Sequence, residues 1–237
     1  MRLKAVYDTL YEDHGPQHWW PGETPFEVMV GAVLTQNTAW SNVEKAITNL
    51  KNAGMLDVDR ITAAGHRTLA GLIRPAGYFN IKAQRLQNFC RWYTARGGFE
   101  LLDALDTDAL REGLLSVNGI GFETADDILL YAFNRPVFVI DAYTRRLFSR
   151  LDIVDGTEHY DSMRQYIERT LHKESQTGKY GKTGKKKRES GLTGLFNEYH
   201  ALIVNHAKNI CRKRPLCRNC CFKDRCPSAP GFLQTVE

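Results

Sequence analysis

Hydrophobic residues recur at helical spacing along most of the chain. The stretch from Pro25 to Leu34 follows Thr24, a good helix-capping residue, and has proline in its first turn. Ser41 is expected to cap another helix, a run of apolar residues at helical spacing, and Ile81–Tyr93 repeats the pattern. We find no convincing series of alternating strands. The pattern therefore predicts an all-α protein.

A glycine-containing turn joins two further predicted helices, Asp108–Leu115 and Thr124–Ala132. The turn has the sequence Val117-Asn-Gly-Ile-Gly121. Glycine permits positive φ and leaves room for a ligand, and the start of a helix offers N–H groups to a phosphate. We expect Gly119 and Gly121 to contact DNA, although an ordinary helix–helix turn would show the same spacing.

A short apolar run, Pro136-Val-Phe-Val-Ile140, predicts a buried extended link that ends at Asp141. Asp141 is placed to cap the next helix. A cap and the helix dipole keep a carboxylate ionised, which suits stabilisation of a cationic sugar. Together with the hairpin, this carboxylate indicates an enzyme that removes a base from DNA.

Composition changes this picture only modestly. The chain has 237 residues, 43% of them hydrophobic, which allows one large or two small domains with a real core. A net charge of +5 fits a polyanionic partner without requiring one. There is no secretory segment at the start, and no apolar run approaches the ~18 residues of a membrane helix. We expect a cytoplasmic, nucleoid-associated monomer with no membrane partner.

Five of the six cysteines lie within residues 211–226, which indicates a metal site rather than disulfides in an intracellular chain. Four of them could bind a [4Fe–4S] cluster or zinc: Cys211, Cys217, Cys220 and Cys226. Cys221 could replace Cys220 as the third ligand. Cys90 stands alone on an apolar helix face and is expected to be a buried thiol.

Residues 173–191 lack apolar side chains and are rich in glycine and lysine. This composition predicts a solvated loop. A grip on the DNA backbone by its lysines is the alternative. Gly181-Lys182-Thr183 lacks the preceding glycine and strand of a phosphate-binding loop.

The motifs Leu115–Asp126 and Val139–Leu147 resemble those of the helix-hairpin-helix DNA glycosylases of the endonuclease III superfamily. The resemblance extends from about Trp19 to Cys226. Three further segments are similar to the 3-methyladenine DNA glycosylase III branch: His18–Pro21, Gly31–Thr38 and Arg74–Tyr78.

This resemblance implies a two-lobed fold. Residues 26–138 would form a six-helix barrel that contains the hairpin. Residues 1–25 and 139–237 would form the second lobe, with a [4Fe–4S] loop at 210–227. The active cleft would lie between the lobes. The superfamily favours iron–sulfur over zinc, although the first gap between ligands is one residue shorter here.

The resemblance also assigns roles to residues, with Asp141 as the catalytic aspartate. It implies a base pocket of Trp40, Trp19, Trp20, Lys208 and Glu123. Alkylated purines are electron-poor and stack well on indoles, although core packing is the alternative for each tryptophan. The expected DNA contacts are Gln36, which would fill the gap left by the flipped nucleotide, and Asn37, Gly119, Gly121, Arg212 and Arg214.

Glu123 stands where bifunctional members carry a Schiff-base lysine, so the resemblance implies a monofunctional glycosylase. Ala32 stands where the adenine-removing branch has a glutamate. The expected substrate is double-stranded DNA with a damaged base, most simply an alkylated purine. The alternatives are a glycosylase for damaged pyrimidines or other purines, and a non-catalytic protein that binds damaged DNA.

Overall fold

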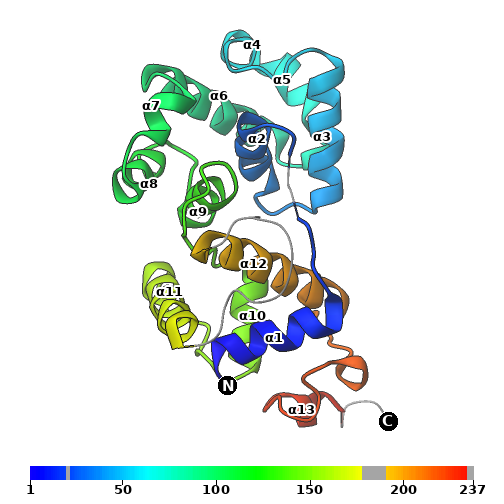
Figure 1. Cartoon of the computed structure of the whole chain (residues 1–237). Helices are drawn as coiled ribbons and strands as arrows, with labels where there is room; N and C mark the ends of the chain where they lie inside the picture. The colour runs from blue at the N-terminus through cyan, green and yellow to red at the C-terminus, as the bar shows by residue number, and fades with distance from the viewer. Residues whose placement is uncertain (20–21, 178–190, 234–237) are drawn as a thin grey trace. The chain divides into compact units, whose positions relative to one another are not determined.

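The computed structural model describes residues 1–19, 22–177 and 191–233, and these residues form helices with no strand. The chain divides into two compact units, one of Met1–Trp19 with Pro136–Glu237 and one of Trp20–Arg135 (Figure 1). The sequence placed the second boundary after residue 138. Phe138 packs edge-on against Phe196 and Tyr199, which joins the extended link to the helix Leu192–Asn209 of the unit that contains Pro136–Glu237.

The Trp20–Arg135 unit contains eight described α-helices and one 3-10 turn, and the resemblance implied a six-helix barrel for residues 26–138. They are α2 (Pro25–Thr35), α3 (Trp40–Asn52), α4 (Val58–Ala63), α5 (His66–Leu72), η1 (Arg74–Ala76), α6 (Phe79–Ala95), α7 (Phe99–Asp103), α8 (Thr107–Leu115) and α9 (Phe122–Tyr131). Helix α2 is almost wholly apolar and buried, and it packs against α3, α6 and α9. Its burial on all sides forms the centre of this core.

Two predicted helix starts had different outcomes. Thr24 caps α2 by accepting a hydrogen bond from the Glu27 N–H at 3.1 Å, which confirms the prediction. The prediction that Ser41 caps the next helix is wrong. The N–H groups of Asn42 and Val43 both bond to the Ala39 carbonyl, so α3 begins at Trp40 and Ser41 lies inside its first turn.

A buried lysine joins three segments of this unit. Lys82 on α6 is 1% exposed, and its Nζ donates to the carbonyl oxygens of Leu34 and Ala76 at 2.8 and 2.7 Å. Burial, with the nearby charge of Arg85, lowers the pKa of Lys82 to about 8. The contacts fix the end of α2 against η1 and so position the loop that contains Gln36.

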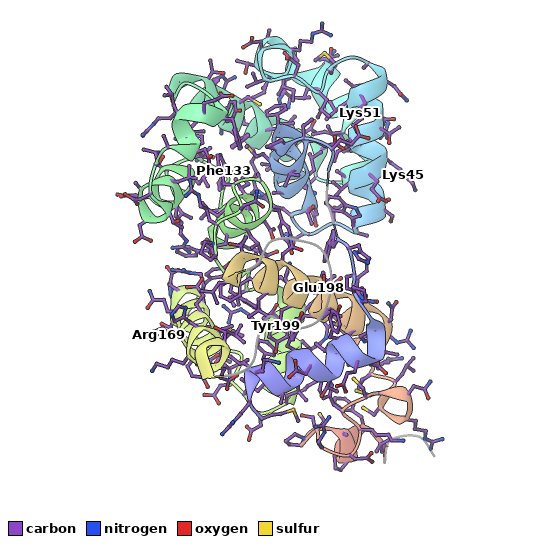
Figure 2. All side chains as sticks on the ribbon, viewed as in Figure 1. Lys45, Lys51, Phe133, Arg169, Glu198 and Tyr199 are labelled. Atoms are coloured by element: carbon purple, nitrogen blue, oxygen red, sulfur yellow. The ribbon has the colours of Figure 1, made fainter. Side chains whose placement is uncertain are left out.

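The other unit contains α1 (Leu3–His14), α10 (Ala142–Arg150), α11 (Tyr160–Thr177), α12 (Leu192–Asn209), η2 (Cys217–Asn219) and α13 (Ala229–Leu233). Helix α12 packs against both α1 and α10 (Figure 1). Tyr199, labelled in Figure 2, is buried in α12, and its hydroxyl donates to the Leu3 carbonyl at 2.8 Å. These contacts hold the first helix of the chain against the C-terminal part.

The predicted loop 173–191 begins later than expected, because α11 continues to Thr177. Glu174 accepts a hydrogen bond from the Lys4 N–H at 2.8 Å, which ties the last turns of α11 to α1. Residues 178–190 lie outside the described residues. In the described part of the chain, no helix is both long enough and apolar enough to span a membrane.

Candidate active site and cysteine cluster

Asp141 lies where a buried extended segment meets α10. Residues 137–140 are at most 2% exposed, and the Ile140 N–H donates to the Tyr160 hydroxyl at 3.2 Å. Asp141 Oδ1 accepts a hydrogen bond from the Thr144 N–H at 2.7 Å. Asp141 therefore caps α10, and both the extended link and the cap are as predicted.

The second carboxylate oxygen of Asp141 faces a histidine. His200 Nε2 on α12 lies 3.6 Å from Asp141 Oδ2. Burial would raise the pKa of Asp141, but the neighbouring His200, together with the Thr144 N–H, holds that pKa below its ordinary value. The carboxylate is consequently ionised at neutral pH, as stabilisation of a developing cation requires.

Trp19 lies on the other partner of this pair, His200. Its indole stacks on the His200 imidazole, with centroids 5.9 Å apart and planes 9° from parallel. One predicted pocket residue thus lies beside the partner of the predicted catalytic carboxylate. Trp20 lies outside the described residues.

Sequence reasoning missed His200. The only signal was a polar residue on the otherwise apolar buried face of α12, which includes Phe196 and Ile203. Such a histidine is as often a core residue as a functional one, and only its contact with Asp141 distinguishes the two.

Of the two glycines in the hairpin between α8 and α9, Gly119 has the positive φ that glycine permits, whereas Gly121 has φ −97°. Gly119 has φ +100°, and a Cβ there would lie 2.3 Å from Cγ of Arg85. Gly121 is the N-cap of α9, so no side chain caps this helix at that position. The start of a helix is where backbone N–H groups can bind an anion such as a phosphate.

Gln36, the predicted gap-filling residue, is bonded to this hairpin. Its Nε2 donates to the Gly119 carbonyl and to the Thr124 hydroxyl, each at 3.0 Å, and its Oε1 accepts from Arg85. The neighbouring Asn37 is exposed in a left-handed conformation with φ 55°. The loop after α2 and the hairpin are thus one connected structure.

The remaining predicted pocket residues lie on three helices. Trp40 begins α3 and is half-buried, with its ring against Gly31 of α2. Glu123 is exposed in the first turn of α9, and Lys208 is exposed in the last turn of α12. Trp40 and Glu123 belong to one unit, and Lys208 belongs to the other with Asp141.

The C-terminal cysteines surround a pocket. Four of its lining residues are the predicted ligands Cys211, Cys217, Cys220 and Cys226, and Cys221 is not among the lining residues. Two N–H groups point at these sulfurs. Arg150 Nη1 lies 3.3 Å from Cys211 Sγ, and the Phe222 N–H donates to Cys220 Sγ at 3.4 Å. Such bonds stabilise thiolate charge.

The spacing of the sulfurs bears on which metal fits. Among the described residues, no three of these four sulfurs lie within 4.8 Å of one another. A single tetrahedral zinc would hold its thiolates about 3.8 Å apart, given Zn–S bonds near 2.3 Å. A tighter group is formed by His206, Cys220 and Cys221. His206 is fully buried and also bonds His14 at 2.9 Å.

The sixth cysteine, Cys90, is buried, and the predicted basic residues Arg212 and Arg214 are exposed. Cys90 is fully buried, and burial raises the pKa of its thiol to about 12, as expected of an inert core residue. Arg212 and Arg214 are exposed beside Cys211. Arg150 donates to the Arg212 carbonyl at 2.7 Å, which anchors this basic segment to α10.

Comparison with known proteins agrees with this geometry. The model of the HhH-GPD superfamily of base excision DNA repair proteins matches residues 30–173. A Methanocaldococcus jannaschii protein, provisionally named a DNA repair glycosylase, is 44% identical over 95% of this chain and 96% of its own length. Endonuclease III of Sulfolobus acidocaldarius is 28% identical over 85% of this chain and 81% of that protein.

Solved structures show the same fold. The H. pylori 3-methyladenine DNA glycosylase bound to 1,N6-ethenoadenine superposes with a TM-score of 0.74 at 30% identity, covering 88% of this chain and 98% of that one. An endonuclease III–DNA complex superposes with a TM-score of 0.75 at 18% identity, covering 98% of this chain and 97% of that one.

The glycine hairpin and the capped carboxylate, on an all-helical chain, define a helix-hairpin-helix DNA glycosylase of base excision repair. The chain belongs to the HhH-GPD superfamily and, within it, to the endonuclease III superfamily, as its sequence motifs predicted.

Proposed function

We propose that the protein is a monofunctional glycosylase that, as a monomer, removes an alkylated purine resembling 3-methyladenine from double-stranded DNA. The observation that carries this proposal is the ionised carboxylate of Asp141, held by the Thr144 N–H and facing His200. A fixed negative charge of this kind favours a transition state in which the sugar becomes cationic.

The reaction would be a hydrolysis. The damaged nucleotide is flipped out of the stack. The bond between C1′ and the base nitrogen breaks, and its electron pair leaves with the base. Water adds to C1′, and its proton passes to solvent or to the departing base. Asp141 stabilises the sugar cation and orients the water. The products are the free base and an abasic site.

Glu123 supports the monofunctional assignment. A lyase step through a Schiff base requires an amine at the reacting sugar. Glu123 offers a carboxylate at the position where the bifunctional relatives in the superfamily have lysine. The abasic site would therefore remain intact until alkali or a separate lyase cleaves it.

Two observations support an alkylated purine as the substrate. The H. pylori relative is a 3-methyladenine DNA glycosylase, 30% identical over most of both chains. Trp40 and Trp19 offer aromatic faces, and electron-poor purines stack favourably on indoles. The endonuclease III relatives favour the rival proposal of another lesion in the same fold.

A panel of duplexes, each containing one defined lesion, tests these assignments. Wild-type enzyme should release free base from alkylated purines, and strands should break only after alkali is added. Release of oxidised pyrimidines alone would favour the rival, and binding without any release would favour the non-catalytic alternative. Efficient borohydride trapping of protein on damaged DNA would refute the monofunctional assignment.

We also propose that the pocket of four cysteines holds a [4Fe–4S] cluster. The four thiolate donors around one pocket and the N–H groups directed at Cys211 and Cys220 fit this group. The cluster would be structural. It would hold Arg212 and Arg214 in one place, where they can contact DNA phosphates.

A further inference from the structure

We infer that His200 is a positioning residue for Asp141, one that keeps the carboxylate ionised and fixes its orientation during base release. This inference rests on the proposed function, because it assigns His200 a role through the carboxylate that acts on the sugar. His200 need not contact the DNA for this role.

The first argument is geometric. Oδ1 of Asp141 accepts a hydrogen bond from the Thr144 N–H, and Oδ2 lies 3.6 Å from His200 Nε2. His200 is 5% exposed, and its ring is stacked on Trp19. The imidazole is thus fixed on one side by an aromatic ring, and it presents a nitrogen to the carboxylate. A hydrogen bond at one oxygen and a buried imidazole beside the other restrict rotation of a carboxylate.

The second argument concerns the other charged groups on the packed elements, which are engaged elsewhere. On α10, Arg145 donates to the Gly156 and Glu158 carbonyls, and Arg146 donates to those of Ala207 and Cys211. On α12, Glu198 accepts from the Gln17 N–H, and Lys208 is exposed.

The flanking elements are similar. On α1, His14 contacts His206, and on α11, Glu168 accepts from the Phe138 N–H and from Arg164, while the Tyr160 hydroxyl bonds the Ile140 N–H. His200 is accordingly the neighbouring titratable group that, with the Thr144 N–H, offsets the effect of burial on the pKa of Asp141.

The direction of the effect follows from these two arguments. With His200 present, the carboxylate stays ionised to a lower pH than burial alone would permit. Without the imidazole, burial dominates and the carboxylate takes up a proton at a higher pH. The fall in base-release rate on the acid side should therefore begin at a higher pH in a His200 variant.

Single-turnover base release across the acid to neutral range tests this inference with three variants. His200→Gln keeps a hydrogen-bond donor without the charge, His200→Leu removes both, and His66→Gln changes an exposed histidine on α5 as a matched control. The acid limb of the pH–rate profile should shift to higher pH by about one unit in both His200 variants and should not shift in the control. At neutral pH, His200→Leu should lose about 10- to 100-fold in rate, with His200→Gln between it and wild type.

A purely structural role for His200 would give a different result. It would lower thermal stability and affinity for the lesion duplex while leaving the acid limb where it is. Coincident pH profiles for wild type and His200→Gln would overturn the inference.

A second measurement does not need activity. The carbon-bound ring proton of His200 can be titrated by NMR in wild type and in Asp141→Asn, with His200→Gln identifying its signal. Because coupling between two titrating groups is reciprocal, the His200 midpoint should fall by about one pH unit when Asp141 loses its charge. If the midpoint of the His200 titration is the same in wild type and Asp141→Asn, the inference is overturned. This measurement does not depend on whether His200→Leu folds. If wild type releases no base from any lesion, the proposed function fails, and the midpoint still decides whether the two residues are coupled.

Discussion

At the scale of single residues, Asp141 combines a structural and a chemical property in one side chain. Its Oδ1 caps α10, and its charge is retained despite burial. Asparagine caps helices about as well as aspartate, but it is neutral. The two properties can therefore be separated by mutation.

We predict that Asp141→Asn lowers the rate of base release by about 100- to 1,000-fold. Thermal stability and affinity for the lesion duplex should change little, because the cap remains and binding depends on phosphates and stacking. Asp141→Ala should in addition cost about 1 kcal/mol of unfolding free energy. Single-turnover kinetics with thermal denaturation checks both, and a near-wild-type rate for Asp141→Asn would remove the residue from catalysis.

A single substitution at Trp40 tests whether this residue forms part of the base pocket. Trp40→Ala should weaken recognition of the lesion by about 1–3 kcal/mol through loss of a base–aromatic stack. Its affinity for undamaged duplex, in which no base is flipped, should stay constant. The ring also packs against Gly31, so thermal stability must be measured in parallel. Equal losses on both duplexes would identify Trp40 as a core residue.

At the scale of elements, the hairpin depends on two glycines for different reasons. Gly119 needs its positive φ and has no room for a Cβ, whereas Gly121 has φ −97° and open space around its Cβ position. A positive φ is thus confined to Gly119, and for Gly121 we propose close approach by a phosphate as the reason for glycine.

We predict that Gly119→Ala destabilises the protein by about 1–3 kcal/mol, because alanine is strained at this φ and displaces Arg85. Gly121→Ala should leave thermal stability unchanged, since nothing occupies the added space. If the hairpin binds phosphate, both variants should bind undamaged duplex more weakly. Full binding by Gly121→Ala would show that the hairpin is only a turn.

At the scale of the whole molecule, the cysteine pocket connects the C-terminal segment to α10 and α12. Arg150 bonds the carbonyls of Arg212 and Lys213 as well as Cys211. A cluster in this pocket would stabilise the C-terminal segment that Arg150 binds. This segment has few apolar residues and so provides little core of its own. Loss of the cluster should therefore release the basic residues rather than unfold the chain.

We predict about four iron atoms per chain and a yellow-brown protein after anaerobic purification. Cys220→Ser should lose the iron, and Cys221→Ser, which changes the neighbouring thiol outside the pocket lining, should retain it. Removal of the cluster should weaken duplex binding and reduce its salt dependence. Stoichiometric zinc without iron would overturn the assignment and point to the tighter group that contains His206 and Cys221.

The sequence by itself determined features that depend on a few neighbouring residues. The helical periodicity, the cap at Thr24, the buried link before Asp141 and the positive φ at Gly119 are all local, and each was predicted correctly. Local signals also misled, because Ser41 looks like a cap although the chain turns into α3 at Ala39.

Only the tertiary structure decided the contacts between distant segments. His200 reaches Asp141 because α12 packs on α10, and Gln36 meets Gly119 because α2 packs on α9. Cys220 lines the pocket and its neighbour Cys221 does not, which the spacing along the chain left open. Spacing along a chain says which groups are available, but packing of elements far apart in sequence sets which of them meet.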